Sequence, residues 1–241
     1  MCISSLLYYL NYLTKYEFVA QPQEGSYNDL LQSLDQNREY SVILMAGQSN
    51  MTGEAKTSKL DVSMKTLPSN VMLFDFSSRP DLIKRTHLFG PELSLARHLG
   101  VVYPNKNFVL IKYALGGASM FNWNSNYNFE LAKLSKYPTF GNMYRNYISI
   151  INKITENRTV NYEALLWMQG ESDAKTKLQA DQYYELFSDF IFSLRRDLNT
   201  PDLKVVLGHI SPPVRFEFKN IVQRAQIKIS TQLENIYVVP T

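Results

Sequence analysis

The chain has 241 residues, of which 45% are hydrophobic and 20% are charged, and its formal net charge is +3. This composition predicts one large globular domain with a sizeable core. The basic residues form no Lys/Arg cluster of five or more, which argues against a nucleic-acid surface. No stretch is long and apolar enough to span a membrane. The single cysteine, Cys2, excludes an intrachain disulfide and a cysteine-rich zinc site.

Residues 1–40 are predicted to form an N-terminal extension that packs on a domain formed by residues 41–241. The chain starts with MCISSLLYYLNYLTKYEF, which has a short apolar section. This start has no positively charged region and no small-residue cleavage site, so it does not indicate a signal peptide. No compartment is predicted from the sequence.

Five apolar, β-branched-rich segments have the pattern of strands buried on both faces, as in a parallel sheet. They are 41–46, 71–76, 107–113, 163–168 and 203–210. Between them lie helical patterns, including GPELSLARHLG, with Pro91 near its start and Gly100 after its end. The alternation predicts a three-layer α/β/α fold of flavodoxin type around a five-stranded parallel sheet. In such folds the functional site lies at the carboxyl ends of the strands.

Three unusual peptides lie at those carboxyl ends. The first strand ends in GQSN (47–50), the third in YALGGAS (113–119) and the fourth in WMQGESDA (167–174). Since parallel strands end at one edge, the three peptides are predicted to meet there.

Each peptide has a functional and a structural interpretation. Ser49 can be a nucleophile at the top of the sheet or the N-cap of the next helix. Gly116-Gly117 can be an ordinary turn or a close backbone approach that aims an N–H at an oxyanion. In QGES, Gln169 can donate to the same oxyanion and Glu171 can orient neighbours or substrate, or the peptide can simply cap a helix.

Together the three peptides resemble those of the SGNH-hydrolase superfamily, in particular its sialate O-acetylesterase-like branch, which includes carbohydrate and acetylxylan esterases. FGPELSLARHLG and IKYALGGASMFNW also resemble that branch, so the similarity covers roughly residues 41 to 240. The resemblance implies Ser49 as nucleophile, with the Ser49 N–H, Gly117 or Gly116, and Gln169 as oxyanion hole. It implies no metal and no organic cofactor.

The resemblance also implies a substrate, an acetylated carbohydrate or another small ester. Gln48, Asn50 and Glu171 are predicted to contact this substrate, with Gly116 as a further backbone contact. After the third strand, Trp123 belongs to an aromatic loop interleaved with asparagines. Aromatic faces pack on pyranose rings, so Trp123 can bind sugar, or the loop can pack its aromatics on the core.

The base that a serine nucleophile needs is not evident. In the resembling family it is the histidine of an Asp-x-x-His motif after the last strand-like segment and before a closing helix. Here ENIYVVPT ends at Thr241, so the motif and the helix are expected to lie beyond the sequence. A flank left uncovered in this way predicts self-association.

Three histidines are present, and none lies in an Asp-x-x-His motif. His209, at the end of the fifth predicted strand, is at the correct edge and is the candidate substitute base. His98 lies near a helix end, where an imidazole interacts favourably with the dipole, and His87 lies in a polar loop.

The function predicted from the resemblance is a serine-type ester hydrolase that removes O-acetyl groups from carbohydrate, with low activity in this chain because its base is not evident. Two alternatives stay open. One is a carbohydrate-binding pseudo-esterase without catalysis, and the other is a lipase- or thioesterase-like SGNH hydrolase that prefers longer acyl groups.

Overall fold

The computed structural model describes residues 29–61, 66–77, 88–211 and 213–241. A six-stranded sheet with strand order β3-β5-β1-β6-β7-β8 lies at its centre, and every neighbouring pair is parallel. A separate two-stranded antiparallel sheet pairs β2 with β4. The strands are β1 (Glu39–Gly47), β2 (Ala55–Lys56), β3 (Val71–Asp75), β4 (Leu88–Phe89), β5 (Phe108–Ala114), β6 (Thr159–Met168), β7 (Lys204–His209) and β8 (Ile236–Pro240).

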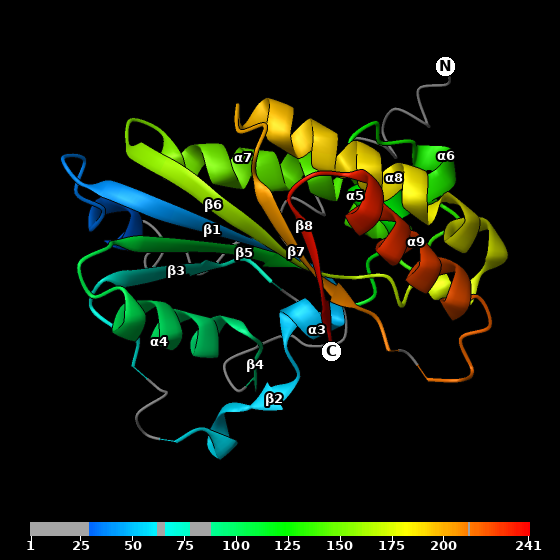
Figure 1. The fold of residues 1–241 in the computed structure, drawn as a ribbon, viewed down its shortest axis with the longest axis horizontal. Coiled ribbons are helices and arrows are strands. Elements are labelled where there is room, and N and C mark those ends of the chain that lie inside the picture. Colours follow the sequence, from blue (N-terminus) through cyan, green and yellow to red (C-terminus); the bar gives the residue numbers. More distant parts are fainter. Residues whose placement is uncertain (1–28, 62–65, 78–87, 212) are drawn as a thin grey trace, which may run out of the picture.

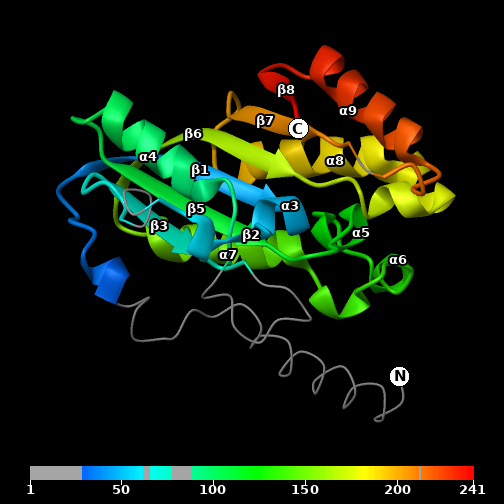
Figure 2. The ribbon, with the colours of Figure 1, turned by 90° about the horizontal axis from the view of Figure 1, so that it is seen from below.

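Helices cover both faces of the sheet (Figures 1 and 2). Helix α4 lies on one face, and α7 lies on the opposite face. Residues of α8 and α9 join the same core cluster as those of α7. The helices are α3 (Ser49–Thr52), α4 (Glu92–Val102), α5 (Met120–Trp123), α6 (Phe129–Ala132), α7 (Met143–Thr155), α8 (Lys177–Asp197) and α9 (Lys219–Gln232). The described residues also form the short 3-10 helices η1 (Thr57–Lys59), η3 (Pro138–Phe140) and η4 (Asp173–Lys175).

The core divides into two clusters because successive side chains of a strand point to opposite faces. In β1, Val42 and Leu44 join the large cluster beneath α7 and α8, while Ile43 and Met45 join a smaller cluster beneath α4. Burial on both faces explains why this strand is an almost continuous apolar run.

The five predicted strands and the three-layer arrangement are confirmed. The prediction of only five strands is wrong by one, since β8 pairs in parallel with β7 as a sixth. Helix α4 also continues past Gly100 to Val102, so that glycine does not end it. Gly100 packs directly on Pro68. A Cβ added at Gly100 would lie 2.3 Å from the proline ring.

The described part of the N-terminal region packs against the domain. Leu34 is buried in the main core cluster, with Leu30 and Leu31 packed against it. Residues 1–28 of the predicted extension lie outside the described residues. Within the ranges that the structure describes, no helix has the length and apolarity needed to cross a membrane.

Candidate active site

The three unusual peptides leave the sheet at one edge, as the sequence predicts. Gly47, the last residue of β1, is in register with Ala114 at the end of β5 and with Met168 at the end of β6. The loops that carry GQSN, GGAS and QGES therefore begin side by side.

Gly47 turns the chain from β1 toward Ser49. Its φ is +151°, and a Cβ at this position would lie 2.2 Å from the Met168 carbonyl oxygen, so the turn requires glycine. The Gln48 amide then donates to the same carbonyl at 2.9 Å. Helix α3 starts directly afterwards at Ser49.

Ser49 is half-buried at the head of α3. Backbone amides at this position have no intrahelical acceptor, so the Ser49 N–H is available to a negatively charged group. Within the described part of the chain, the Ser49 hydroxyl has no hydrogen-bond partner. The arrangement presents both a hydroxyl and an N–H at the edge of the sheet.

A buried polar network lies beneath this serine. The side-chain carbonyl of Gln48 accepts hydrogen bonds from the Ser172 amide at 3.2 Å and from Gln169 Nε2 at 3.4 Å. Gln169 is fully buried, and its Nε2 also donates to the Ala118 carbonyl at 3.1 Å and to the carboxylate of Asp173. The network connects all three loops through side-chain amides.

Asp173 is the buried carboxyl group of this network. Its oxygens accept the Met120 amide at 3.0 and 3.2 Å, in addition to the Gln169 amide. Burial raises the pKa of Asp173 to about 7, although these hydrogen bonds lower it, and nearby Glu171 raises it further.

Glu171 reaches back to the GQSN loop. Asn50 Nδ2 donates to Glu171 Oε1 at 2.5 Å, and burial raises the pKa of the Glu171 carboxyl even though this hydrogen bond lowers it. Three buried side-chain oxygens of the QGES peptide have no hydrogen-bond partner among the described residues: Gln169 Oε1, Glu171 Oε2 and Ser172 Oγ. Most buried polar atoms of a folded protein are paired, so three unpaired oxygens within one peptide make QGES a candidate site.

The glycine pair is a tight turn beside this network. Gly116 is buried, and Gly117 has a φ of +89°. A Cβ at Gly117 would lie 2.4 Å from the Tyr137 ring, so a close approach requires glycine here.

Trp123 lies in the core beneath the site. It has no exposed surface, its Nε1 donates to the Gly47 carbonyl at 3.3 Å, and its ring meets Trp167 and Phe190 edge to face. In this structure Trp123 supports the end of β1 and presents no face to a ligand.

The described histidines are His98 and His209, and His87 lies outside the described residues. His209 is half-buried at the end of β7, and its carbonyl accepts the Thr241 hydroxyl at 2.7 Å. Strand β6 separates β7 from β1, so the ends of these two strands are about 10 Å apart. His98 is exposed on α4.

Other residues that hydrogen-bond to the loops of the site are not predicted as functional from the sequence. Tyr183 of α8 and Gln226 of α9 both donate to the Gln169 carbonyl, at 3.0 and 3.2 Å, and fix the QGES loop. Lys112 is fully buried in β5 and reaches Glu92 and the Thr52 carbonyl at the end of α3. A lone charge within an apolar strand is the sequence signal that could have identified Lys112.

A group of cationic side chains lies near QGES, because Lys175, the last residue of η4, interacts with Lys136, Arg215 and Glu171. Lys175 Nζ and the Arg215 guanidinium lie 5.2 and 5.5 Å from the centre of the Phe216 ring, and Lys136 Nζ lies 4.8 Å from that of Tyr137. Partial burial lowers the pKa of Lys175, and the charges of Lys136 and Arg215 lower it further, while Glu171 and Asp173 raise it.

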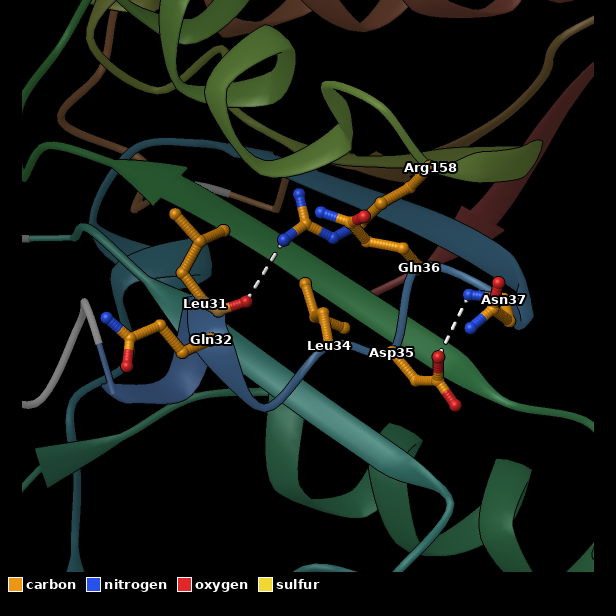
Figure 3. A pocket seen from close by; sticks show the side chains of 7 residues that line it. All are labelled: Leu31, Gln32, Leu34, Asp35, Gln36, Asn37 and Arg158. Atoms are coloured by element: carbon orange, nitrogen blue, oxygen red, sulfur yellow. Dashed lines mark hydrogen bonds between the residues drawn. The ribbon is translucent and has the colours of Figure 1, made fainter.

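A cavity of about 530 Å³ lies at the other end of the sheet. Figure 3 shows Arg158, which precedes β6, reaching the Leu31 carbonyl, with Asp35 bound to the backbone of Asn37. Because these residues precede β1 and β6, the cavity lies at the amino ends of the strands, away from Ser49. Among the described residues, no group of three or more His, Cys, Asp or Glu side chains is placed to hold a metal ion.

The fold and the three converging loops define an α/β protein with the SGNH-hydrolase fold. The family model "carbohydrate esterase, sialic acid-specific acetylesterase" (SASA) matches residues 39–241, most of the chain, so the chain belongs to this family.

Solved structures have the same fold at low sequence identity. A protein from Arabidopsis thaliana is 20% identical with a TM-score of 0.64, and the match covers 83% of this chain and 84% of that one. NanS is 15% identical with a TM-score of 0.62, over 86% of this chain and 79% of that one. A carbohydrate acetylesterase from Xanthomonas citri is 15% identical with a TM-score of 0.56, over 83% of this chain and 49% of that one. No curated protein matches the sequence.

Proposed function

We propose that the protein is a serine-type esterase that removes O-acetyl groups from a carbohydrate, with Ser49 as its nucleophile. The observation that carries the proposal is the placement of Ser49. Its hydroxyl and amide lie at the head of α3, and the Asn50–Glu171 hydrogen bond joins its loop to the buried unpaired acceptors of QGES. Membership of the carbohydrate esterase family supports the reaction class.

The reaction proceeds in two steps. Ser49 Oγ attacks the acetyl carbonyl carbon, a base takes the hydroxyl proton, and the carbonyl oxygen becomes a tetrahedral oxyanion. The intermediate collapses, the sugar oxygen leaves with a proton, and acetyl-Ser49 remains. Water then hydrolyses this ester to acetate and restores Ser49.

The backbone amides of Ser49 and Gly117 are the proposed oxyanion donors. Gln169 is proposed as the third, although its Nε2 is now occupied by the Ala118 carbonyl and by Asp173. Donation to the oxyanion requires Gln169 to exchange one of these hydrogen bonds. Gln48, Asn50, Gly116 and Glu171 are the proposed substrate contacts.

His209 is the proposed base, because it is the described histidine at the carboxyl edge of the sheet. Its path to Ser49 crosses the end of β6, so it must reach over the QGES loop. His98, exposed on α4, is the matched control.

The substrate is proposed to be an acidic sugar that carries O-acetyl groups. Lys175 and Arg215 lie against Phe216, and Lys175 also interacts with the charge of Glu171. These two cations favour a substrate carboxylate. A neutral acetylated xylo-oligosaccharide lacks that group.

The test is hydrolysis of 4-nitrophenyl acetate and of O-acetylated sialic acid by wild type, Ser49→Ala, His209→Ala and His98→Ala. Loss of the base or nucleophile of a serine hydrolase costs on the order of 10⁴-fold or more in rate. We expect that loss in Ser49→Ala and His209→Ala and wild-type rates in His98→Ala. Equal hydrolysis by wild type and Ser49→Ala would refute the nucleophile.

One observation favours a second candidate, a carbohydrate-binding protein without turnover. The Ser49 hydroxyl has no hydrogen-bond partner in the described structure, whereas an activated serine is bonded to its base. Sugar binding by calorimetry without any Ser49-dependent hydrolysis would support this candidate. Faster hydrolysis of 4-nitrophenyl octanoate than of acetate would instead indicate a lipase-like hydrolase.

A further inference from the structure

Lys112 is a fully buried cation in the second strand of the sheet. It belongs to β5, in which every residue is buried, and its Nζ has three acceptors. These are Glu92 Oε2 at 2.6 Å, the Thr52 carbonyl at 3.1 Å and Asp75 Oδ2 at 3.2 Å. A buried ammonium group is tolerated only when its donors are satisfied, as they are here.

The acceptors connect Lys112 to the end of the nucleophile turn. Thr52 is the last residue of α3, and its carbonyl is one of those that a helix leaves without an intrahelical partner. A cation at this end of a helix also interacts favourably with the helix dipole. Lys112 therefore holds the carboxyl end of the single turn that starts at Ser49.

Glu92 fixes the next residue of the same turn. Its second oxygen, Oε1, accepts the Gly90 amide at 2.8 Å. Gly90 packs directly on Gly53, where a Cβ would lie 2.2 Å from the Gly90 nitrogen. Gly53 in turn donates to the Ser49 carbonyl at 2.8 Å and ends α3.

A purely stabilising role does not explain this cluster. Replacing a buried ion pair by apolar side chains of similar volume is often neutral or stabilising. The cluster does, however, impose a position on a four-residue helix, which is too short to be stable by itself.

We propose that Lys112 and Glu92 are positioning residues that fix α3 and thereby set the place of Ser49. The effect on catalysis rests on the function proposed for Ser49. A displacement of about 1 Å of a reacting group can cost about 100-fold in rate.

The test compares Lys112→Met and Glu92→Gln with Arg195→Met as matched control. Arg195 is a buried cation of α8 that donates to the Leu203 and Glu234 carbonyls, at the opposite edge of the sheet. Hydrogen exchange of the peptide containing residues 49–53 reports on α3 without requiring any activity. We expect exchange at least tenfold faster in Lys112→Met, several-fold faster in Glu92→Gln and unchanged in Arg195→Met.

Kinetics supply the second readout. We expect kcat to fall about 100-fold in Lys112→Met with KM nearly unchanged, while Arg195→Met keeps the wild-type kcat. If Lys112→Met does not fold, Glu92→Gln decides the exchange test.

Failure of the positioning role can be distinguished from failure of the proposed function. Unchanged exchange at residues 49–53, or equally faster exchange in Arg195→Met, would overturn the positioning role. Absence of Ser49-dependent hydrolysis in the wild type would overturn the proposed function and leave the exchange result valid.

Discussion

Asn50 and Glu171 join the loop after β1 to the loop after β6, because Asn50 Nδ2 donates to Glu171 Oε1 at 2.5 Å. Asn50 follows the candidate nucleophile, and Glu171 lies in the QGES peptide. The hydrogen bond lowers the pKa of Glu171, while burial, the larger effect, raises it. The ionisation of Glu171 and the position of the GQSN loop are thus coupled.

Asn50→Ala is expected to shift the acidic limb of activity toward higher pH. Without the donor, the pKa of the buried Glu171 rises further, so a higher pH is needed to ionise it. We also expect kcat/KM to fall about tenfold, or about 1.4 kcal/mol. The measurement is the pH dependence of kcat/KM.

Glu171→Gln is the matched control, since it keeps an acceptor for Asn50 and removes the titrating group. Its pH profile is expected to lose this limb altogether. An acidic limb that is the same in wild type and Asn50→Ala would contradict the coupling.

Asp173 is expected to make the protein less stable as pH rises. Its folded pKa is about 7 against an ordinary value of 3.8, so between these values the folded state binds the proton more tightly than the unfolded state. The contribution of Asp173 to the free energy of unfolding is fully present below about pH 4, falls as pH rises and levels off above about pH 7. Its full size is about 4 kcal/mol.

Chemical denaturation between about pH 4 and pH 8 checks this expectation. In Asp173→Asn, the free energy of unfolding should fall less with pH than in wild type. Asp181→Asn, at an exposed carboxylate of α8, controls for the loss of one negative charge. The prediction fails if wild type and Asp173→Asn lose stability in parallel.

The sequence predicted the fold well where burial imposes a pattern. Strands buried on both faces, such as β1 and β5, are apolar runs that need no tertiary information to identify. The sequence does not predict strand β8, because it is a short edge strand with exposed Tyr237 and Val239 and ends at Pro240. The two-residue strands β2 and β4 have no pattern at all.

The site was predictable only in part, for a similar reason. The meeting of three peptides follows from parallel topology, which the sequence predicts. The partners of Asp173 and Lys112 depend on which segments the folded chain brings together. Trp123 shows the same limit, since an aromatic residue between asparagines can face a sugar or the core, and here it is buried against Trp167.

Gly117→Ala is expected to damage both stability and activity. The left-handed backbone conformation, with φ of +89°, costs about 1 kcal/mol for alanine, and the new Cβ would lie 2.4 Å from the Tyr137 ring. We expect a loss of at least tenfold in kcat, because the new Cβ displaces the loop that carries Gly117 from its present position. Thermal denaturation and kcat measure the two effects.

Gly141→Ala is the matched control, because Gly141 has a φ of +62° and an alanine Cβ there would have no atom within 4 Å. This variant should carry only the backbone cost and keep the wild-type kcat. An equal loss of kcat in both variants would mean that the close approach at Gly117 is not what activity requires.

The cations beside Phe216 are expected to determine preference for an acidic sugar. Lys175 approaches the ring from η4 and Arg215 from the segment before α9. Both residues are exposed to solvent, so each should contribute less than about 1 kcal/mol to substrate binding. Arg215→Ala and Lys175→Ala should each raise KM for O-acetylated sialic acid about two- to fivefold. KM for acetylated xylo-oligosaccharide should stay constant, because that substrate has no carboxylate.

Ionic strength separates charge from shape in this experiment. Salt screens exposed charges over about 10 Å at 0.1 M, so the KM difference between variant and wild type should shrink as NaCl rises from about 0.02 to about 0.5 M. Lys177→Ala is the control, since that lysine pairs with Asp181 at 2.5 Å on the exposed face of α8. If the variants raise KM equally for both sugars, or independently of salt, then the cations do not recognise a substrate carboxylate. The proposed preference for an acidic sugar would then be wrong, whereas the proposed role of Ser49 would not be affected.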